Sequence, residues 1–337
     1  MKKRILVTGG AGFVGHHVIE TLLRETDFDV VSLDRLDTSG TLNRLQHVLS
    51  LNPNWVHRLK VVWHDLKAPV NDFVADLIGP ITHVLHLAAG SHVDRSIENP
   101  MDFVMDNVVG TCNILDYARL RLGKKLELFL YFSTDEVFGP APEGVFYKED
   151  DRYKSGNPYA ATKAGAEELC VSYQNTYKMP IITTHTMNVF GDRQHPEKFI
   201  PLIISSVRDG KKIYIHSNKE RTKAGSRHYI DAKDVAEAVL FLFDNHKVGE
   251  KYNIVGREET DNLELATMIA DIMGKPLVYE MLDFHSSRPG HDLRYALSGD
   301  KMEKLGWGPQ KDLRERLKGV VSWSLENDTW LRNRDED

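Results

Sequence analysis

The sequence has few cysteines, no long hydrophobic run and no excess of positive charge. Its only cysteines, Cys112 and Cys170, are too few for a disulfide framework and too far apart to suggest a zinc site. No apolar run approaches the roughly 20 residues of a membrane helix, and the run at 5–7 is too short for a signal peptide. A formal net charge of -6 argues against nucleic acid as a partner. We therefore expect a cytoplasmic protein that has no membrane, nucleic-acid or metal partner.

Apolar and charged residues are present in the proportions of a soluble globular protein, 41% and 27% of 337 residues. Short apolar runs typical of buried strands occur at 4–8, 29–33, 61–63, 83–87, 126–132 and 181–185. Helical patterns fall between them, at 16–24, 103–120 and 158–177. This alternation predicts an α/β fold with a Rossmann-type, doubly wound parallel sheet.

The regular alternation of strand and helix patterns ends at about residue 188. Connections lengthen, and helical patterns follow at 201–208, 234–244, 262–273 and 313–326, with one more apolar strand at 252–255. We expect residues 1–187, rejoined by about 227–255, to form the first domain. Residues 188–226 and 256–330 are expected to form a smaller mixed α/β C-terminal domain.

A glycine-rich turn separates the first strand from the first helix. Gly9, Gly12 and Gly15 allow a tight turn, close approach of the backbone to a pyrophosphate, and close packing of helix on strand. Asp34 follows 19 residues after Gly15, where a carboxylate binds ribose hydroxyls and repels a 2′-phosphate. The order of these features favours NAD binding over the alternative that the glycines only form a turn.

Tyr159 and Lys163 are four residues apart and so share one face of the predicted helix. A neighbouring ammonium, together with the positive charge of an oxidised nicotinamide, would lower the pKa of the phenol and make Tyr159 a base near neutral pH. The alternative is a surface pair with no chemical role.

The strand expected before that helix ends at Thr134, Asp135 and Glu136. Ligands of open α/β sheets bind at the carboxyl ends of the strands. Two adjacent carboxyl groups with different pKa values can divide the roles of acid and base. The alternative is a solvated acidic turn.

With these motifs, the sequence resembles the extended short-chain dehydrogenase/reductases and, within them, the nucleotide-sugar 4,6-dehydratases. The resemblance covers nearly the whole chain. It rests on residues 8–15, 34–36, 87–89, 91–96, 107–111, 133–139, 159–163, 196–201, 252–254 and 288–292. It implies that the first domain binds NAD tightly and that the second binds a nucleotide sugar. It also implies a homodimer built from a four-helix bundle of the helices near 103–122 and 158–177.

The resemblance implies a mechanism for each catalytic residue. Tyr159 removes the O4 proton of the hexose while Thr134 holds that oxygen, and a hydride passes from C4 to NAD. Glu136 takes the C5 proton, Asp135 protonates the departing C6 hydroxyl, and the hydride returns to C6. Lys163 lowers the pKa of Tyr159 and binds the nicotinamide ribose. The product is a 4-keto-6-deoxy sugar.

The resemblance also implies two sets of binding residues. The cofactor-binding residues are Gly9, Gly12, Phe13, Val14, Gly15, Asp34, Arg35, Leu36, Asp65, Leu66, Leu87, Ala88, Ala89, Asn107, Tyr159 and Lys163. The substrate-binding residues are Ser91, His92, Asn188, Lys198, Tyr214, Arg227, Asn253 and His291.

Some alternatives stay open. Gly90 and the segments 188–192 and 218–224 depart from the family's pattern around the nucleotide, which leaves the nucleotide open among dTDP, UDP, GDP and CDP. A related 4-epimerase or decarboxylase usually lacks the acidic pair in this form. A non-catalytic NAD-binding scaffold would need neither Tyr159 nor Lys163.

Overall fold

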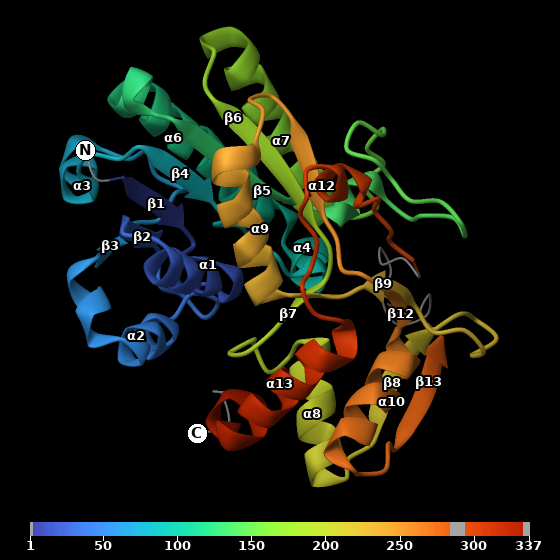
Figure 1. Ribbon diagram of the computed structural model, residues 1–337. Helices are drawn as coiled ribbons and strands as arrows, with labels where there is room; N and C mark the ends of the chain where they lie inside the picture. Colours follow the sequence, from blue (N-terminus) through green and yellow to red (C-terminus); the bar gives the residue numbers. More distant parts are fainter. Residues whose placement is uncertain (1–2, 284–293, 333–337) are drawn as a thin grey trace.

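The core of the molecule is a seven-stranded parallel sheet, seen near the centre of the computed structural model in Figure 1. The structure describes residues 3–283 and 294–332. The strand order is β11-β6-β5-β4-β1-β2-β3. The bounds are β1 Arg4–Thr8, β2 Asp29–Asp34, β3 Leu59–Trp63, β4 His83–His86, β5 Leu128–Thr134, β6 Ile181–Thr186 and β11 Lys251–Ile254. The predicted parallel, Rossmann-type sheet is confirmed.

Helices cover both faces of this sheet, which explains why most of its strands are buried along nearly their whole length. Residues of β1 alternate between the two faces: Ile5 and Val7 pack on one side and Leu6 on the other. The first face is covered by α1 (Phe13–Glu25), α2 (Leu42–Leu51) and α9 (Ala232–Asn245). The second is covered by α3 (Asp72–Ile78), α6 (Gly110–Tyr117) and α7 (Pro158–Tyr177).

The helix expected over 103–120 is observed as a series of helical segments. A short α5 (Pro100–Phe103) leads into a π-helical segment at Val104–Val109, then α6, then a second π-helical segment at Ala118–Leu122. The strand expected at 126–132 lies two residues further on, as β5, and therefore carries Thr134 as its last residue. Sequence periodicity did not predict α2, α3, α4 (Val93–Glu98) or α12 (Asp300–Lys304). Short 3₁₀ helices lie at Pro53–His57, Gly123–Lys125, Asp135–Phe138 and Asp328–Leu331.

A second apolar cluster lies in the lower part of Figure 1. It is formed by α8 (Phe199–Asp209), α10 (Asn262–Met273) and α13 (Leu313–Glu326) with β8 (Ile213–Ser217). Strand β8 pairs with β13 (Tyr279–Asp283) in parallel, and β9 (Ser226–His228) pairs with β12 (Glu259–Asp261) antiparallel. The short strands β7 (Val189–Phe190) and β10 (Ile230–Asp231) pair where the chain passes between the two clusters.

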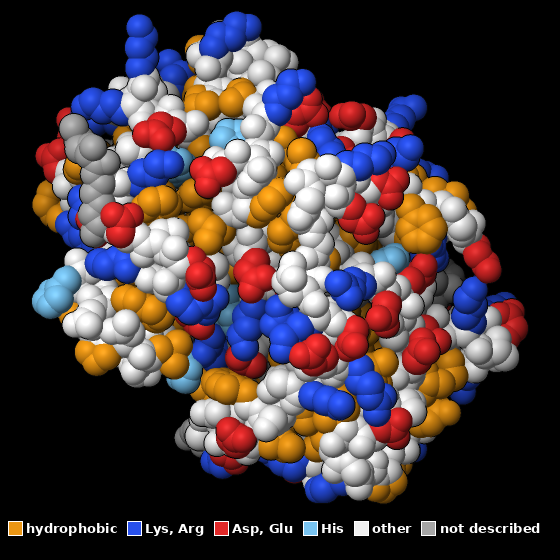
Figure 2. Space-filling model, viewed as in Figure 1, with side chains coloured by type: hydrophobic (Ala, Val, Ile, Leu, Met, Phe, Trp, Pro, Cys, Tyr) orange, Lys and Arg blue, Asp and Glu red, His pale blue; other side chains and the backbone are white. Residues whose placement is uncertain are grey.

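The chain returns from this second cluster to the central sheet through α9 and β11. Helix α9 packs on α1, and β11 pairs with β6 at the sheet edge. On the face drawn in Figure 2, basic and acidic side chains are interspersed. Within 3–283 and 294–332, no helix has the length and apolar character needed to cross a membrane.

Candidate active site

The glycine-rich turn is closed so tightly that side chains would not fit. A Cβ on Gly15 would lie 2.1 Å from the Gly9 carbonyl oxygen, and one on Gly9 would lie 2.9 Å from the Ala88 backbone. Gly9 also has a φ of +68°, which favours glycine. Helix α1 begins next, at Phe13 and Val14, so its free N–H groups are available to a phosphate. This cradle fits the pyrophosphate of a dinucleotide.

Asp34 is the last residue of β2, and its carboxylate accepts hydrogen bonds from both the glycine-rich turn and the loop that follows β2. Its Oδ2 accepts a hydrogen bond from the Ala11 N–H (3.1 Å), and its Oδ1 accepts one from the Leu36 N–H (2.8 Å). Only 7% of Asp34 is exposed, and burial raises its pKa despite these two bonds. The carboxylate retains acceptor capacity for the hydroxyls of an adenosine ribose.

Other predicted cofactor residues line the same edge of the sheet. The Arg35 guanidinium is held by Asp37 (2.5 Å) and Asp106 (2.6 Å), so its charge is already neutralised by protein carboxylates. Leu66 is buried beside α6, and Asp65 accepts a hydrogen bond from the Lys67 N–H (2.9 Å). Leu87, Ala88 and Ala89 follow β4, with the Ala88 N–H bonded to the Thr8 hydroxyl (3.2 Å).

Asn107 lies beneath this edge rather than on it. It is buried, its Oδ1 accepts from the Gly90 N–H (2.8 Å), and its Nδ2 donates to the Gly90 carbonyl (3.1 Å) and the Thr162 hydroxyl (2.9 Å). The structure therefore gives Asn107 the role of fixing the loop at Gly90 against α7.

The predicted catalytic residues meet where β5 ends and α7 begins. Thr134 is the last residue of β5 and donates to Asp135 Oδ1 (3.0 Å). Asp135 and Glu136 form the following 3₁₀ turn, and Thr134 also hydrogen-bonds Tyr159 of α7. The structure thus brings the hydroxyl, the two carboxyl groups and the phenol into one cluster.

Asn157 is a residue of this cluster that sequence reasoning missed. Its Nδ2 donates to Glu136 Oε2 (2.9 Å), while its Oδ1 accepts from the Ala160 N–H (2.8 Å) as the N-cap of α7. The Asn157-Pro158 pair is the common N-cap and N1 combination, so the helix start was readable. The contact to Glu136 depends on tertiary packing and was not.

Burial controls the protonation of the acid pair. It raises the pKa of Asp135 to about 6 and, together with repulsion from Asp135, raises the pKa of Glu136 to about 7. Asp135 is 5% exposed, and its Oδ2 finds no hydrogen-bond partner among the described residues. Both groups are therefore able to exchange protons near neutral pH, and one of them has an oxygen free for a ligand.

Tyr159 and Lys163 are both buried, and burial shifts the pKa of each. Burial, followed by the charges of Glu136 and Asp135, raises the pKa of Tyr159 above its usual value. The Lys163 ammonium donates instead to the Phe132 carbonyl (2.6 Å), and burial lowers its own pKa to about 8. The protein alone therefore disfavours the tyrosinate, because burial and the two carboxyl groups act on the phenol in the same direction. The prediction for Tyr159 included the charge of bound nicotinamide and stays a prediction.

Basic side chains surround the acid pair. The positive charges of Arg227, on β9, and of Lys198 oppose the rise in the pKa of Glu136. Arg227 lies over the Tyr295 ring (4.6 Å), and the charge of Lys198 lowers the pKa of His92, whose ordinary value burial already lowers. Ser91 is exposed immediately before His92. Arg227 and Lys198, called the cationic wall below, thus place two positive charges near the acid pair, and such groups pair with phosphate oxygens.

The remaining predicted substrate-binding residues differ from one another in their exposure to solvent. Asn188 is exposed beside β7, and Tyr214 is 54% exposed on β8. Asn253 is 0% exposed, and its amide is bonded to protein groups, so the structure does not present it to a ligand. His291 lies outside the described residues.

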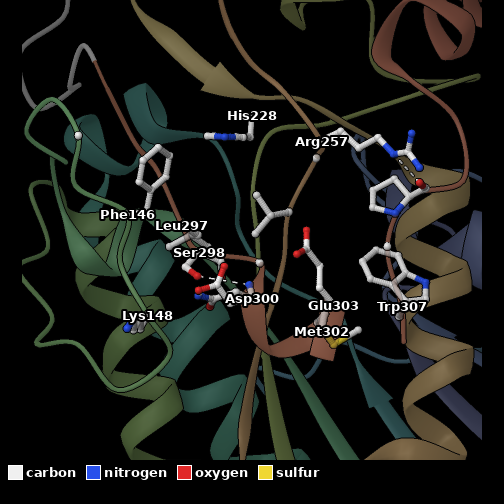
Figure 3. A pocket seen from close by; sticks show the side chains of 17 residues that line it. Phe146, Lys148, His228, Arg257, Leu297, Ser298, Asp300, Met302, Glu303 and Trp307 are labelled. Carbon is white, nitrogen blue, oxygen red and sulfur yellow. Dashed lines mark hydrogen bonds between the residues drawn. The ribbon is translucent and has the colours of Figure 1, made fainter. Parts of the chain in front are cut away.

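A separate cavity of about 470 Å³ opens elsewhere, beside α12. Phe146 and Lys148 lie on one side of it, and Arg257 and Trp307 lie on the other (Figure 3). Its lining contains none of the residues predicted for catalysis. No group of three or more potential metal ligands occurs within 3–283 and 294–332.

The fold and this cluster together define an NAD-dependent short-chain dehydrogenase/reductase of the extended, nucleotide-sugar-modifying type. A family described as GDP-mannose 4,6 dehydratase matches residues 6–320. The chain is 38% identical to the low-salt glycan biosynthesis protein Agl12 of Haloferax volcanii, covering 96% of this chain and 99% of that protein. It is 34% identical to the dTDP-glucose 4,6-dehydratase of Salmonella typhimurium, covering 98% and 95%.

Solved structures of nucleotide-sugar enzymes have the same fold as this chain. The dTDP-glucose 4,6-dehydratase DesIV of Streptomyces venezuelae, solved with NAD bound, superimposes with a TM-score of 0.85 at 31% identity, covering 97% of this chain and 98% of that one. A UDP-glucose 4-epimerase of Thermus thermophilus, also with NAD, gives 0.82 at 28% identity, covering 95% and 98%. The chain belongs to the nucleotide-sugar 4,6-dehydratase family. It is an NAD-dependent enzyme of the hydro-lyase class.

Proposed function

We propose that the enzyme dehydrates a nucleoside diphosphate hexose of the glucose type to its 4-keto-6-deoxy form. The observation that carries this proposal is the buried Asp135-Glu136 pair beside Tyr159. A 4-epimerase needs a base for the O4 proton but no second acid-base pair for C5 and C6. Two carboxyl groups with pKa values raised to about 6 and about 7 are suited to that second task.

The cofactor site supports this reaction. The glycine cradle would hold the pyrophosphate of NAD, Asp34 its adenosine ribose, and Lys163 its nicotinamide ribose. NAD, when bound, supplies the redox chemistry by accepting the C4 hydride and returning it to C6. Its positive nicotinamide would favour the Tyr159 phenolate that the protein alone disfavours.

The chain's own residues move the protons. Tyr159 accepts the O4 proton, while the Thr134 hydroxyl holds that oxygen. Glu136, oriented by Asn157, removes the proton from C5 and returns a proton to C5 once C6 is reduced. Asp135 delivers a proton to the leaving C6 hydroxyl through its unpartnered Oδ2. This division of labour requires a protonated Asp135 and an ionised Glu136. That is the reverse of the order that pKa values of about 6 and about 7 give in the protein alone, so bound substrate and NAD have to move the shared proton from Glu136 to Asp135.

The cationic wall would bind the substrate. Arg227 and Lys198 are assigned to the diphosphate because guanidinium and ammonium groups pair with phosphate oxygens. Ser91 and His92 are assigned to the hexose, and Asn188 and Tyr214 to the nucleotide. The departures around residues 188–192 and 218–224 leave the base open among thymine, uracil, guanine and cytosine.

A substrate panel tests the proposal. The holoenzyme is incubated with the dTDP, UDP, GDP and CDP forms of glucose and N-acetylglucosamine, and products are weighed by mass spectrometry. Loss of one water from at least one donor is expected, and Tyr159→Phe abolishes it. A change of C4 configuration at constant mass would identify an epimerase instead. No change with any donor would support a scaffold and contradict the proposal.

We further propose that the enzyme is a homodimer of the reducing cytoplasm. Exposed apolar side chains on the helices at 100–122 and 158–177 support the dimer, among them Leu120 (66% exposed) and Tyr177 (49%). The two cysteines are free, which fits a reducing compartment. Light scattering should give twice the mass of one chain, and Leu120→Glu should reduce it to one.

A further inference from the structure

A buried polar network lies beneath the acid pair and takes no part in the proposed chemistry. Glu167 of α7 is 0% exposed and lies 3.1 Å from His185 Nε2, on β6, and 3.0 Å from Lys251 Nζ, on β11. The Tyr153 hydroxyl also donates to Glu167. Four separate segments of the chain therefore converge on one carboxylate.

His185 is bound from both sides. Asn253 Nδ2 donates to the carbonyls of Tyr147 (3.1 Å) and Ser298 (3.1 Å), so its Oδ1 faces His185 Nδ1 at 3.0 Å. Both ring nitrogens of His185 thus face oxygen atoms of buried side chains within hydrogen-bond distance. Such an imidazole cannot rotate without losing a buried hydrogen bond.

The His185 ring is in turn packed on Phe138. The two ring centroids are 4.8 Å apart in a T-shaped arrangement, and Tyr153 and Tyr147 contact other sides of Phe138 at 5.1 and 5.7 Å. Phe138 is fully buried and is the last residue of the 3₁₀ turn Asp135–Phe138. The network therefore fixes the far end of the turn whose near end carries the two carboxyl groups.

We propose that His185, held by Glu167 and Asn253, is a positioning residue for the elimination of water, acting through Phe138 on the Asp135-Glu136 turn. The inference rests on the proposed dehydration. It follows because Tyr159 and Lys163 are fixed separately, by α7 and the Phe132 carbonyl, whereas the acid pair depends on the turn. Loosening Phe138 should misplace Asp135 and Glu136 while leaving the first oxidation intact.

Two variants test this coupling. His185→Gln keeps polar contacts but removes the ring from Phe138, and Phe138→Leu removes the partner ring while leaving the network intact. The matched control is Asp234→Asn, which breaks another buried ion pair, with Arg316, between α9 and α13. Holoenzymes are mixed with the active donor from the substrate panel. The reduced-cofactor absorbance reports C4 oxidation, and mass spectrometry reports water loss.

We expect both variants to oxidise C4 at nearly the wild-type rate with unchanged KM, and to lose water about 10- to 100-fold more slowly. With substrate deuterated at C5, the isotope effect on turnover should rise in both variants and not in Asp234→Asn. A purely structural role would slow both half-reactions together or give the control the same profile, and either result would overturn the proposal. Wild-type enzyme that releases no water would overturn the proposed function as well, whereas normal dehydration by both variants would overturn the positioning role alone.

Discussion

Two glutamates, Glu136 in the turn that ends at Phe138 and Glu167 in the polar network packed on Phe138, differ in the direction of their pKa shifts. Burial and repulsion from Asp135 raise the pKa of Glu136 to about 7. Burial alone would raise the pKa of Glu167 too, but His185, Lys251 and Tyr153 together lower it to about 2. The residue type is the same, and the number of cations and donors decides the outcome. One carboxyl group is kept able to exchange a proton, and the other is kept as a permanent anchor.

The largest difference should appear in catalysis. Glu136→Gln removes the proposed base for the C5 proton, and loss of a general base costs about 100- to 10,000-fold. We expect water release to fall by about 1,000-fold, while substrate still generates reduced-cofactor absorbance. The control is Glu168→Gln, an exposed glutamate on α7. Water release by Glu136→Gln within tenfold of wild type would show that this carboxylate is not the base.

For the stability of the fold, in contrast to catalysis, we expect Glu167 to matter more than Glu136. Glu167→Gln removes the charge that pairs with Lys251 and the hydrogen-bond partner shared by His185 and Tyr153. Breaking such a buried group costs about 3 kcal/mol of unfolding free energy. A group with a pKa below its usual 4.5 contributes stability above that value and loses it as pH falls toward 2. The deficit of Glu167→Gln, measured by urea unfolding, should therefore be full at neutral pH and shrink below about pH 4. A constant deficit across that range would refute the electrostatic account.

Asp135→Asn should stabilise the enzyme. The pKa of Asp135 is raised from 3.8 to about 6, so its ionised form is penalised in the folded state. That penalty is fully present above about pH 6 and absent below 3.8, and it amounts to about 3 kcal/mol. Thermal unfolding should show a gain in Tm at neutral pH that disappears in acid. A loss of Tm at neutral pH would mean that the hydrogen bond from Thr134 outweighs burial.

The sequence predicted the acid pair that contains Glu136, but it did not predict the polar network around Glu167. Apolar runs separated by helical patterns predicted the parallel sheet, and Thr134, Asp135 and Glu136 were visible because they follow a strand. Glu167 and His185 carry no such signal, because a lone glutamate in a helix and a lone histidine in a strand are common. Their contact exists only because α7 packs across β6. The sequence also did not predict that burial raises the pKa of Tyr159 in the protein alone, since spacing along a helix gives no measure of burial.

The smallest expected effect links the two regions through Lys163, one helical turn before Glu167 on α7. Burial lowers the pKa of Lys163 to about 8, and the negative charge of Glu167 limits that fall. Removing this charge in Glu167→Gln should lower the pKa of Lys163 further, so that the ammonium loses its proton at a lower pH. The rate of C4 oxidation, measured in single turnovers against pH, should then decline at a lower pH than in wild type, by less than about 1 unit. Glu168→Gln should leave the profile unchanged, and a shift toward higher pH in Glu167→Gln would show that the two regions are not electrostatically coupled in this way.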